Sequence, residues 1–143
     1  MKLLFLCTGN SCRSQMAEGW AKRFAPAGWH IESAGIEAHG QNPRAIAVMN
    51  EAGVDISGQQ STVLTDAILH NADYLITVCG HADEVCPLPP PGTRKEHWPL
   101  DDPAKATGSE EDIMTAFRAT RDEVRRRVQG LIERLAGEQG AEA

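Results

Sequence analysis

The sequence has 143 residues, of which 41% are hydrophobic and 24% charged, a composition typical of a globular protein, and we expect a single domain over residues 1–143. With 14 Lys and Arg against 20 Asp and Glu, the net charge is −6, which argues against a nucleic-acid partner because such partners need a basic face. No apolar run approaches the roughly 20 residues of a membrane helix, so we expect no membrane partner and a cytoplasmic protein, monomeric by default. In that compartment four cysteines are more typical of catalytic, redox or metal sites than of structural disulfides.

The first half of the chain predicts two strands and three helices from its apolar pattern. The expected elements are a strand over residues 3–6, a helix over 16–24, a strand over 29–33, a helix over 43–52 and a shorter helix over 63–69. The opening strand is a continuous apolar run, as in strands covered on both faces, and it is too short for a secretory signal. Asn42 and Pro43 are typical of a helix start, and Gly53 of a helix end.

The second half predicts two further strands and a long final helix. The expected elements are a strand over residues 74–78, a stiff proline-rich segment over 87–92, a short strand over 97–100 and a helix from 109 onward. Ser109 and Asp112 form a capping-box pattern at the start of that helix. Its buried stripe is expected to be Ile113, Phe117, Val124, Val128, Leu131 and Leu135. Residues 137–143 are expected to be frayed.

This alternation of strands and helices predicts an α/β fold, a four-stranded parallel sheet with helices on both faces. Ligands in such folds lie where strand ends pass into helices. Cys7 and Cys79 each follow a predicted strand at that kind of position. The segments that begin at these two cysteines are therefore the candidates for a functional site.

The loop from Cys7 to Ser14 has the parts of an anion site joined to a nucleophile. A loop that leads into a helix points backbone N–H groups at one spot, where the helix dipole favours negative charge. Gly9 lets the backbone curl, and the planar guanidinium of Arg13 matches two oxygens of a tetrahedral oxyanion. The same positive field would stabilise a thiolate on Cys7, with a hydrogen bond from Ser14. The alternative is a strand-to-helix turn with a buried cysteine.

A carboxylic acid and a pair of cysteines are the other candidates. Asp101 and Asp102 precede Pro103, a pattern that fits either a simple turn or an acid that protonates a departing oxygen. Cys79 and Cys86 lie seven residues apart, roughly 10.5 Å along a helix, whereas a disulfide needs Cα atoms about 4.4–6.8 Å apart. The segment would therefore have to unwind to join them, which would make it a redox switch. The alternatives are two buried thiols, or a zinc site that also uses His81 but has no common spacing and no evident fourth ligand.

Several strings in the chain carry a resemblance to a known family. The loop from Cys7 to Ser14 resembles the phosphate-binding loop of low-molecular-weight protein tyrosine phosphatases. The longer string CTGNSCRSQMAEG, residues 7–19, resembles the thioredoxin-coupled arsenate reductases built on that fold. The strings SAGIE at 33–37 and EHW at 96–98 fit the same family. The resemblance covers nearly the whole chain.

The resemblance implies that the protein reduces arsenate to arsenite through three cysteines and so contributes to arsenic detoxification. Cys7 would attack arsenate while Asp102, directly before the proline, protonates the departing oxygen, with Asp101 as the fallback. Cys79 would attack the sulfur of the Cys7–arseno adduct, and Cys86 would then free Cys7 and leave a Cys79–Cys86 disulfide. A thioredoxin would reduce that disulfide, and no metal or organic cofactor is expected.

The resemblance also implies how the substrate is held. The residues expected to bind arsenate are Thr8, Gly9, Asn10, Ser11, Cys12, Arg13 and Ser14. Some members of the family bind a potassium ion through residues that match Asn10, Glu18 and Ser33. A further ligand there is often Asp, whereas this chain has Thr62.

Two rival functions and several unassigned residues complete the interpretation. A tyrosine phosphatase of the same fold usually carries aromatic residues after its acid, whereas Ala104 and Lys105 follow here, although weak phosphatase activity could coexist with reduction. An oxyanion sensor without turnover would leave the later cysteine pair idle. Cys12 is interpreted as a buried spacer, the alternative being a thiol that traps Cys7 as a disulfide under oxidation. The five histidines are interpreted as surface or structural residues, and the three arginines at 125–127 as a solvated helix face.

Overall fold

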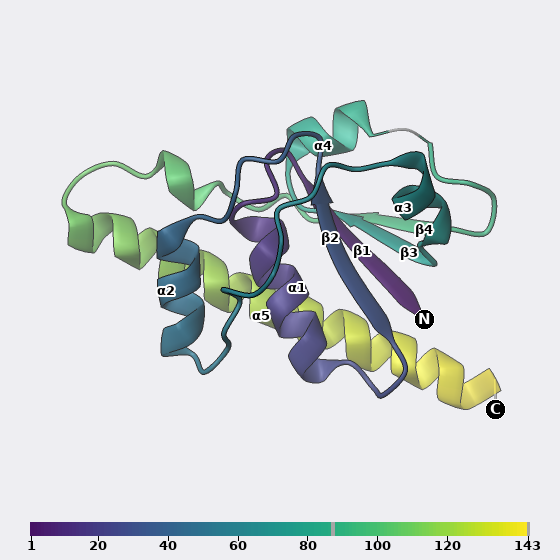
Figure 1. Ribbon diagram of the computed structural model, residues 1–143. Coiled ribbons are helices and arrows are strands. Elements are labelled where there is room, and N and C mark those ends of the chain that lie inside the picture. Colours follow the sequence, from purple (N-terminus) through teal and green to yellow (C-terminus); the bar gives the residue numbers. More distant parts are fainter. Residues whose placement is uncertain (87, 143) are drawn as a thin grey trace.

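The computed structural model describes residues 1–86 and 88–142, with side chains as far as residue 139 (Figure 1). Its elements, in chain order, are β1 (Lys2–Cys7), α1 (Arg13–Phe24), β2 (His30–Gly35), α2 (Pro43–Glu51), α3 (Asp66–Asn71), β3 (Tyr74–Thr77), α4 (Gly80–Val85), β4 (Arg94–His97), the 3-10 helix η1 (Pro103–Lys105) and α5 (Glu110–Glu142). None of the helices among these residues is long and apolar enough to cross a membrane.

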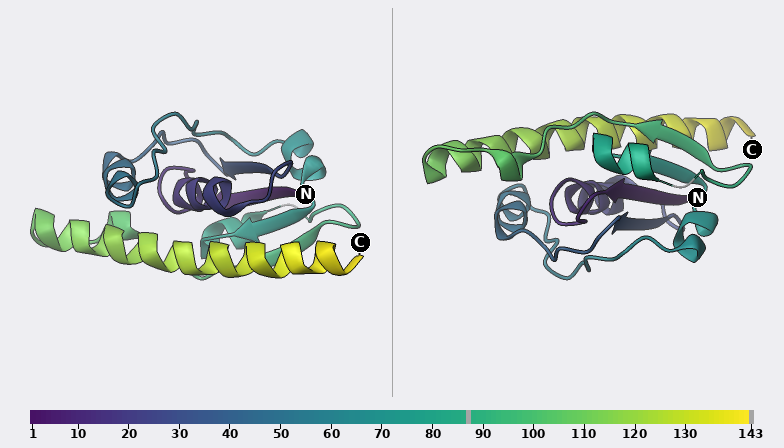
Figure 2. Two further views of the ribbon diagram at one scale, coloured as in Figure 1. Left: turned by 90° about the horizontal axis from the view of Figure 1, so that it is seen from below. Right: turned by 90° about the horizontal axis from the view of Figure 1, so that it is seen from above.

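The four strands form one parallel sheet in the order β2-β1-β3-β4. Helices α1 and α5 cover one face, and α3 and α4 lie on the other, as Figure 1 and the two views of Figure 2 show. The predicted fold class is therefore confirmed. The chain leaves β1 for β2 on one side and later returns to β3 on the other, so the ends of β1 and β3 form the switch point where such sheets bind ligands.

The core explains why the central strand carries an unbroken apolar run. Every residue of β1 after Lys2 is buried, because helices cover both faces of the sheet. On one face, Phe5 packs against Trp98, with ring centroids 5.9 Å apart. Trp20 of α1 and Phe117 of α5 are also fully buried. Each large apolar side chain buried in this way stabilises the fold by about 1.5–3 kcal/mol, and the layer fixes the end of β1 in place.

The start of α2 and the start of α5 confirm the predicted caps. The Asn42 side chain accepts the backbone N–H of Arg44, and Pro43 occupies the first helical position. Ser109 and Asp112 form the reciprocal capping box, with each side chain accepting the other's backbone N–H. All of the predicted stripe of α5 is buried except Ile113, which is half-buried against the core.

Three predicted segments differ from the structure. The helix expected over residues 63–69 is α3, which begins at Asp66 because the Thr65 side chain caps it, while Val63 bridges to Gly35. The strand expected over 97–100 is β4, which ends at His97 because its partner β3 ends at Thr77.

The C-terminus also departs from the prediction. The tail expected to fray over residues 137–143 is helical to Glu142, where Glu138 pairs with Arg94 and Gln139 accepts a hydrogen bond from the Trp29 indole. Ala143 lies outside the described residues, as does Pro87 of the predicted proline-rich segment.

Candidate active site

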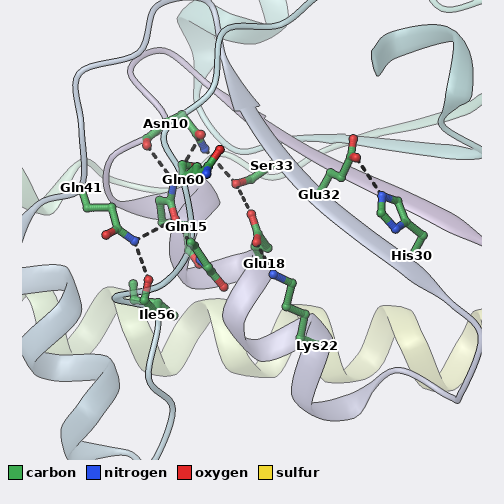
Figure 3. Close-up of polar contacts among 11 residues, drawn as sticks. Asn10, Gln15, Glu18, Lys22, His30, Glu32, Ser33, Gln41, Ile56 and Gln60 are labelled. Atoms are coloured by element: carbon green, nitrogen blue, oxygen red, sulfur yellow. Dashed lines mark hydrogen bonds and ion pairs between the residues drawn. The ribbon is translucent and has the colours of Figure 1, made fainter. Parts of the chain in front are cut away.

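The loop between β1 and α1 is held in shape by a buried asparagine. Asn10 has a positive φ of 48° and no exposed surface. Its Oδ1 accepts the backbone N–H of Thr62 at 2.8 Å, which fixes the orientation of the amide. Its Nδ2 therefore faces two hydroxyls and donates to Ser14 Oγ at 2.8 Å and to Ser33 Oγ at 2.9 Å. Figure 3 shows Asn10 and one of these partners, Ser33.

These hydrogen bonds place a hydroxyl beside the Cys7 sulfur. The sulfur of Cys7 lies 2.9 Å from Ser14 Oγ. Ser14 Oγ accepts a proton from Asn10 and keeps its own hydroxyl proton, which a thiolate at Cys7 would accept. The buried Asn10 therefore acts on Cys7 through Ser14, a relation that spacing in the sequence does not reveal.

Two glycines let other segments approach the loop closely. A Cβ on Gly35 would lie 2.3 Å from the carbonyl oxygen of Glu37 and 2.8 Å from the backbone nitrogen of Asn10. A Cβ on Gly9 would lie 2.4 Å from Nδ1 of His39, whose imidazole rests against the loop. The Gly35 contacts are to backbone atoms, so packing requires glycine there, whereas a Cβ on Gly9 would displace the exposed side chain of His39.

The first turn of α1 is open toward the cavity. Its N-cap residue, Cys12, makes no side-chain cap hydrogen bond, so the N-terminal N–H groups are available to an anion. Arg13 begins the helix and donates from Nη1 to the carbonyl oxygen of Leu100 at 3.0 Å. Its Nε is buried and has no partner among the described residues. A buried unpaired donor is costly, and an oxyanion in the cavity would satisfy it.

Asp102 lies opposite this guanidinium. Its Oδ2 is 3.6 Å from Arg13 Nη2, while its Oδ1 caps η1 by accepting the N–H of Ala104 at 3.0 Å. Both interactions need the side chain of Asp102, so the Asp-Asp-Pro pattern is a turn and also faces the cavity. Asp101 is exposed and lines the same cavity.

One cavity of about 680 Å³ collects these groups. Its lining residues are Cys7, Thr8, Gly9, Ser11, Cys12, Arg13, His39, Cys79, Gly80, His81, Leu100, Asp101, Asp102, Ala104 and Lys105. The structure thus brings together Cys7, Arg13, Cys79 and Asp102, as predicted from separate parts of the sequence. Asn10 and Ser14 support the loop from behind, and Cys86 does not line the cavity.

The two later cysteines lie at the two ends of α4. Cys79 is the N-cap, and its sulfur accepts the N–H of Ala82 at 3.4 Å and lies 3.2 Å from Thr8 Oγ1. Cys86 is the C-cap and is half-buried, and this burial raises the pKa of its thiol. No disulfide joins any two of the four cysteines. The segment between the pair is a helix, which was not among the predicted elements, and in this form the two cysteines are too far apart for a disulfide.

Two cavity residues and one buried thiol complete the surroundings. His39 and Lys105 bring basic groups to the cavity from outside the loop, and no spacing signal identified His39. Cys12 is buried, as predicted for a spacer, and burial raises the pKa of its thiol to about 11. It therefore stays protonated at neutral pH.

The residues expected around a potassium ion form a closed network. Ser33 accepts from Asn10 and donates to Glu18 Oε1 at 2.5 Å. The other carboxylate oxygen of Glu18 pairs with Lys22 Nζ at 2.5 Å (Figure 3). Thr62 contributes its backbone N–H to Asn10. The charge of Glu18 is thus balanced by Lys22 of this chain, so these residues do not fit a further cation.

Comparison with known proteins gives a consistent result. A family model described as low molecular weight phosphotyrosine protein phosphatase matches residues 2–141. Curated relatives from Bacillus licheniformis and Bacillus subtilis, both named arsenate reductase, are 55% and 52% identical over 131 residues, which is 92% of this chain and 94% of each relative.

The solved structures include both reductases and phosphatases. A structure described as an arsenate reductase in the phosphate binding state is 37% identical, with a TM-score of 0.76 over 93% of this chain and 97% of its own. An arginine phosphatase from Geobacillus stearothermophilus is 25% identical, with a TM-score of 0.83 over 99% of this chain and 97% of its own. The chain therefore belongs to the low molecular weight phosphotyrosine protein phosphatase family, in which its curated relatives at 50% identity and above are named arsenate reductase.

Proposed function

We propose that this protein is an arsenate reductase that works through a three-cysteine relay. The observation that carries the proposal is the shared cavity of Cys7 and Cys79, with Cys79 joined to Cys86 by a single short helix. A phosphatase needs the first cysteine alone, whereas a reductase needs a second thiol within reach of the first. The relatives named arsenate reductase support the same reading.

The first step is the attack of Cys7 on arsenate. The oxyanion lies against the first turn of α1 and the guanidinium of Arg13, whose Nε lacks a partner among the described residues. The Cys7 thiolate, which accepts the Ser14 hydroxyl proton, forms a bond to arsenic. Asp102 donates a proton to the departing oxygen, which leaves as water. The product is a covalent Cys7–arsenate adduct.

The next two steps transfer two electrons to arsenic. The Cys79 thiolate attacks the sulfur of Cys7, the S–As bond breaks, and its electron pair passes to arsenic, so arsenite leaves. Cys7 and Cys79 are then joined by a disulfide. Cys86 attacks the sulfur of Cys79 and releases the Cys7 thiolate, which leaves Cys79–Cys86 oxidised. The geometry of α4 requires it to unwind for this second disulfide.

The reductant that recharges the enzyme is the remaining part of the proposal. A thioredoxin would exchange its dithiol for the Cys79–Cys86 disulfide, and the two electrons would come from that partner. We assign the reaction to the cytoplasm, because repeated reduction of a disulfide needs a compartment that keeps thiols reduced. A monomer is the default assignment.

The test couples the purified protein to thioredoxin, thioredoxin reductase and NADPH. NADPH loss should depend on arsenate and on Cys7. Cys86→Ser should release about one arsenite per molecule and then stop with Cys7 joined to Cys79, which peptide mass mapping would identify. Glu84→Gln, an exposed change on the same helix, should turn over normally. Sustained turnover by Cys86→Ser, or normal turnover by Cys7→Ser, would overturn the relay.

A weak phosphatase activity is a second candidate, favoured by the same cavity and by the phosphatases among the structural neighbours. Hydrolysis of a small aryl phosphate needs Cys7, Arg13 and Asp102 but neither later cysteine. Cys79→Ser should therefore keep this activity while arsenate reduction is lost. Loss of both activities in that variant would show that Cys79 does not act as a separate redox thiol.

A further inference from the structure

Helix α4 is too short to be stable by its own hydrogen bonds. It has six residues and begins at Gly80, and helices of this length are unstable in water without tertiary contacts. Among its residues only Ala82 is buried. Its cap is the sulfur of Cys79, a weak acceptor, at 3.4 Å from the N–H of Ala82. Something else must keep α4 wound.

The polar contacts of Asp83 supply that support. Asp83 lies in the middle of α4, and its Oδ1 accepts a hydrogen bond from Thr77 Oγ1 at 3.1 Å. Lys95 Nζ lies 3.0 Å from the same oxygen. Thr77 Oγ1 is also 2.8 Å from Nδ1 of His97. Because the Thr77 hydroxyl gives its only proton to Asp83, the Nδ1–H of His97 donates to Thr77.

This arrangement ties α4 to two strands of the sheet. Thr77 is fully buried at the end of β3, and Lys95 and His97 belong to β4. The hydrogen bond of Lys95 holds the pKa of Asp83 below its usual range, so the carboxylate is charged at neutral pH. If Asp83 moved away, the buried hydroxyl of Thr77 would lose its acceptor, which is unfavourable. We call Asp83 and these three partners the Asp83 tether.

We propose that the Asp83 tether keeps α4 wound and thereby sets how readily Cys79 and Cys86 can form a disulfide. Asp83 acts as a positioning residue, because it acts on the cysteines through the helix. The proposal rests on the redox pair described under Proposed function and names a residue that governs the dithiol–disulfide equilibrium of that pair. The tether favours the dithiol form, in which α4 is helical.

Unwinding has to break the tether for a geometric reason. A disulfide brings its Cα atoms to about 4.4–6.8 Å, whereas the two ends of this helical segment are roughly 10.5 Å apart. Closing that gap breaks the backbone hydrogen bonds from Asp83 N to Cys79 O and from Cys86 N to Ala82 O. Asp83 takes part in the first of these bonds, so its side chain moves with the backbone.

The charges around Cys86 agree with this direction. Burial raises the pKa of Cys86, the charge of Asp83 raises it further, and Lys95 lowers it. While α4 is wound, the ammonium of Lys95 is paired with Asp83. Release of Asp83 would remove the carboxylate charge that disfavours the Cys86 thiolate, the form that attacks a disulfide. The wound state therefore has the less reactive thiol.

The first measurement compares wild type with Asp83→Asn, which keeps the size of the side chain and loses its charge. Amide hydrogen exchange of the reduced protein is followed in the peptide that spans residues 79–86. The amides of α4 should exchange about tenfold faster in Asp83→Asn, while the amides of β1 should be unchanged. Glu84→Gln makes the same charge change at an exposed neighbour and should exchange like wild type. Equal exchange in all three proteins would overturn the proposal.

The second measurement is the disulfide equilibrium, made in a Cys7→Ser, Cys12→Ser background so that only Cys79 and Cys86 can pair. Oxidised dithiothreitol takes two electrons and two protons from the two thiols, forming the disulfide and reduced dithiothreitol. Asp83→Asn should raise the equilibrium constant about tenfold, which is a potential about 30 mV more negative. An unchanged constant despite faster exchange would overturn the link to the cysteines. If no variant forms the disulfide, the relay under Proposed function fails with it, while the exchange result still decides whether the tether holds α4.

Discussion

Replacement of Asn10 with alanine should destabilise the fold because one buried amide joins three segments. The amide makes four side-chain hydrogen bonds, to Ser14, Ser33, Thr62 and Gln15. A hydrogen bond contributes roughly 0.5–1.5 kcal/mol net, and partners left unsatisfied in the interior cost more. A non-glycine residue at positive φ costs about 1–2 kcal/mol when its side chain cannot compensate. We therefore expect Asn10→Ala to lose about 3–5 kcal/mol of unfolding free energy.

Urea unfolding measures this loss from the midpoint and slope. Asn10→Gly removes the same hydrogen bonds but tolerates the φ of 48°, so it should be about 1 kcal/mol more stable than Asn10→Ala. Asn50→Ala, an exposed asparagine on α2, should change stability by less than about 0.5 kcal/mol. A loss below about 1 kcal/mol in Asn10→Ala, or a glycine variant less stable than the alanine variant, would refute the reasoning.

Three further outcomes are expected. Burial raises the pKa of Cys12 to about 11, so this thiol should resist iodoacetamide at pH 8 in the native protein. Peptide mapping that finds Cys12 alkylated as fast as an exposed thiol would contradict its burial. Hydrogen bonding to Arg118 lowers the pKa of Glu51, so this pair adds stability above pH 4.5 that is lost on acidification. Arg118→Ala should therefore reduce the fall in Tm between pH 6 and pH 3. An unchanged dependence of Tm on pH would show that the pair does not contribute. Gly35→Ala should destabilise the fold by more than about 2 kcal/mol, because backbone atoms occupy the space of its Cβ. Gly130→Ala, open to solvent on α5, should stabilise the fold by about 0.5–1 kcal/mol. Similar thermal stability of the two variants would rule out the close packing at Gly35.

The sequence predicted the sheet and the cavity from local signals. The apolar run of β1 and the glycine-containing loop after it gave the position of Cys7, and the alternation of strands and helices gave the parallel sheet. Parallel strands bring their carboxyl ends to one edge, so Cys79 after β3 had to lie near Cys7. The neighbouring acid, Asp102, needed the family resemblance, because the Asp-Asp-Pro pattern is also that of a turn, and the structure finds both features in one residue.

Contacts between distant residues were beyond the sequence. Strand β4 begins with Arg94 and Lys95, which are exposed on the edge of the sheet, so no apolar pattern marked its start. Lys22 neutralises Glu18 across one helical turn. The burial of the Glu18 carboxylate beside Ser33, however, depends on how α1 packs on β2. The tether of Asp83 to Thr77 likewise joins two elements whose angle is set by the whole sheet.

The position of Cys79 as the cap of α4 means that its sulfur has two incompatible tasks. As a cap, it receives the amide proton of Ala82 at 3.4 Å and secures the first turn. A sulfur that rotates toward Cys7 to form a bond abandons that amide, and the turn loses its acceptor at the moment the bond is made. Under the proposed relay, a bond from Cys79 to Cys7 would thus loosen the helix that separates Cys79 from Cys86, so the first exchange would prepare the second.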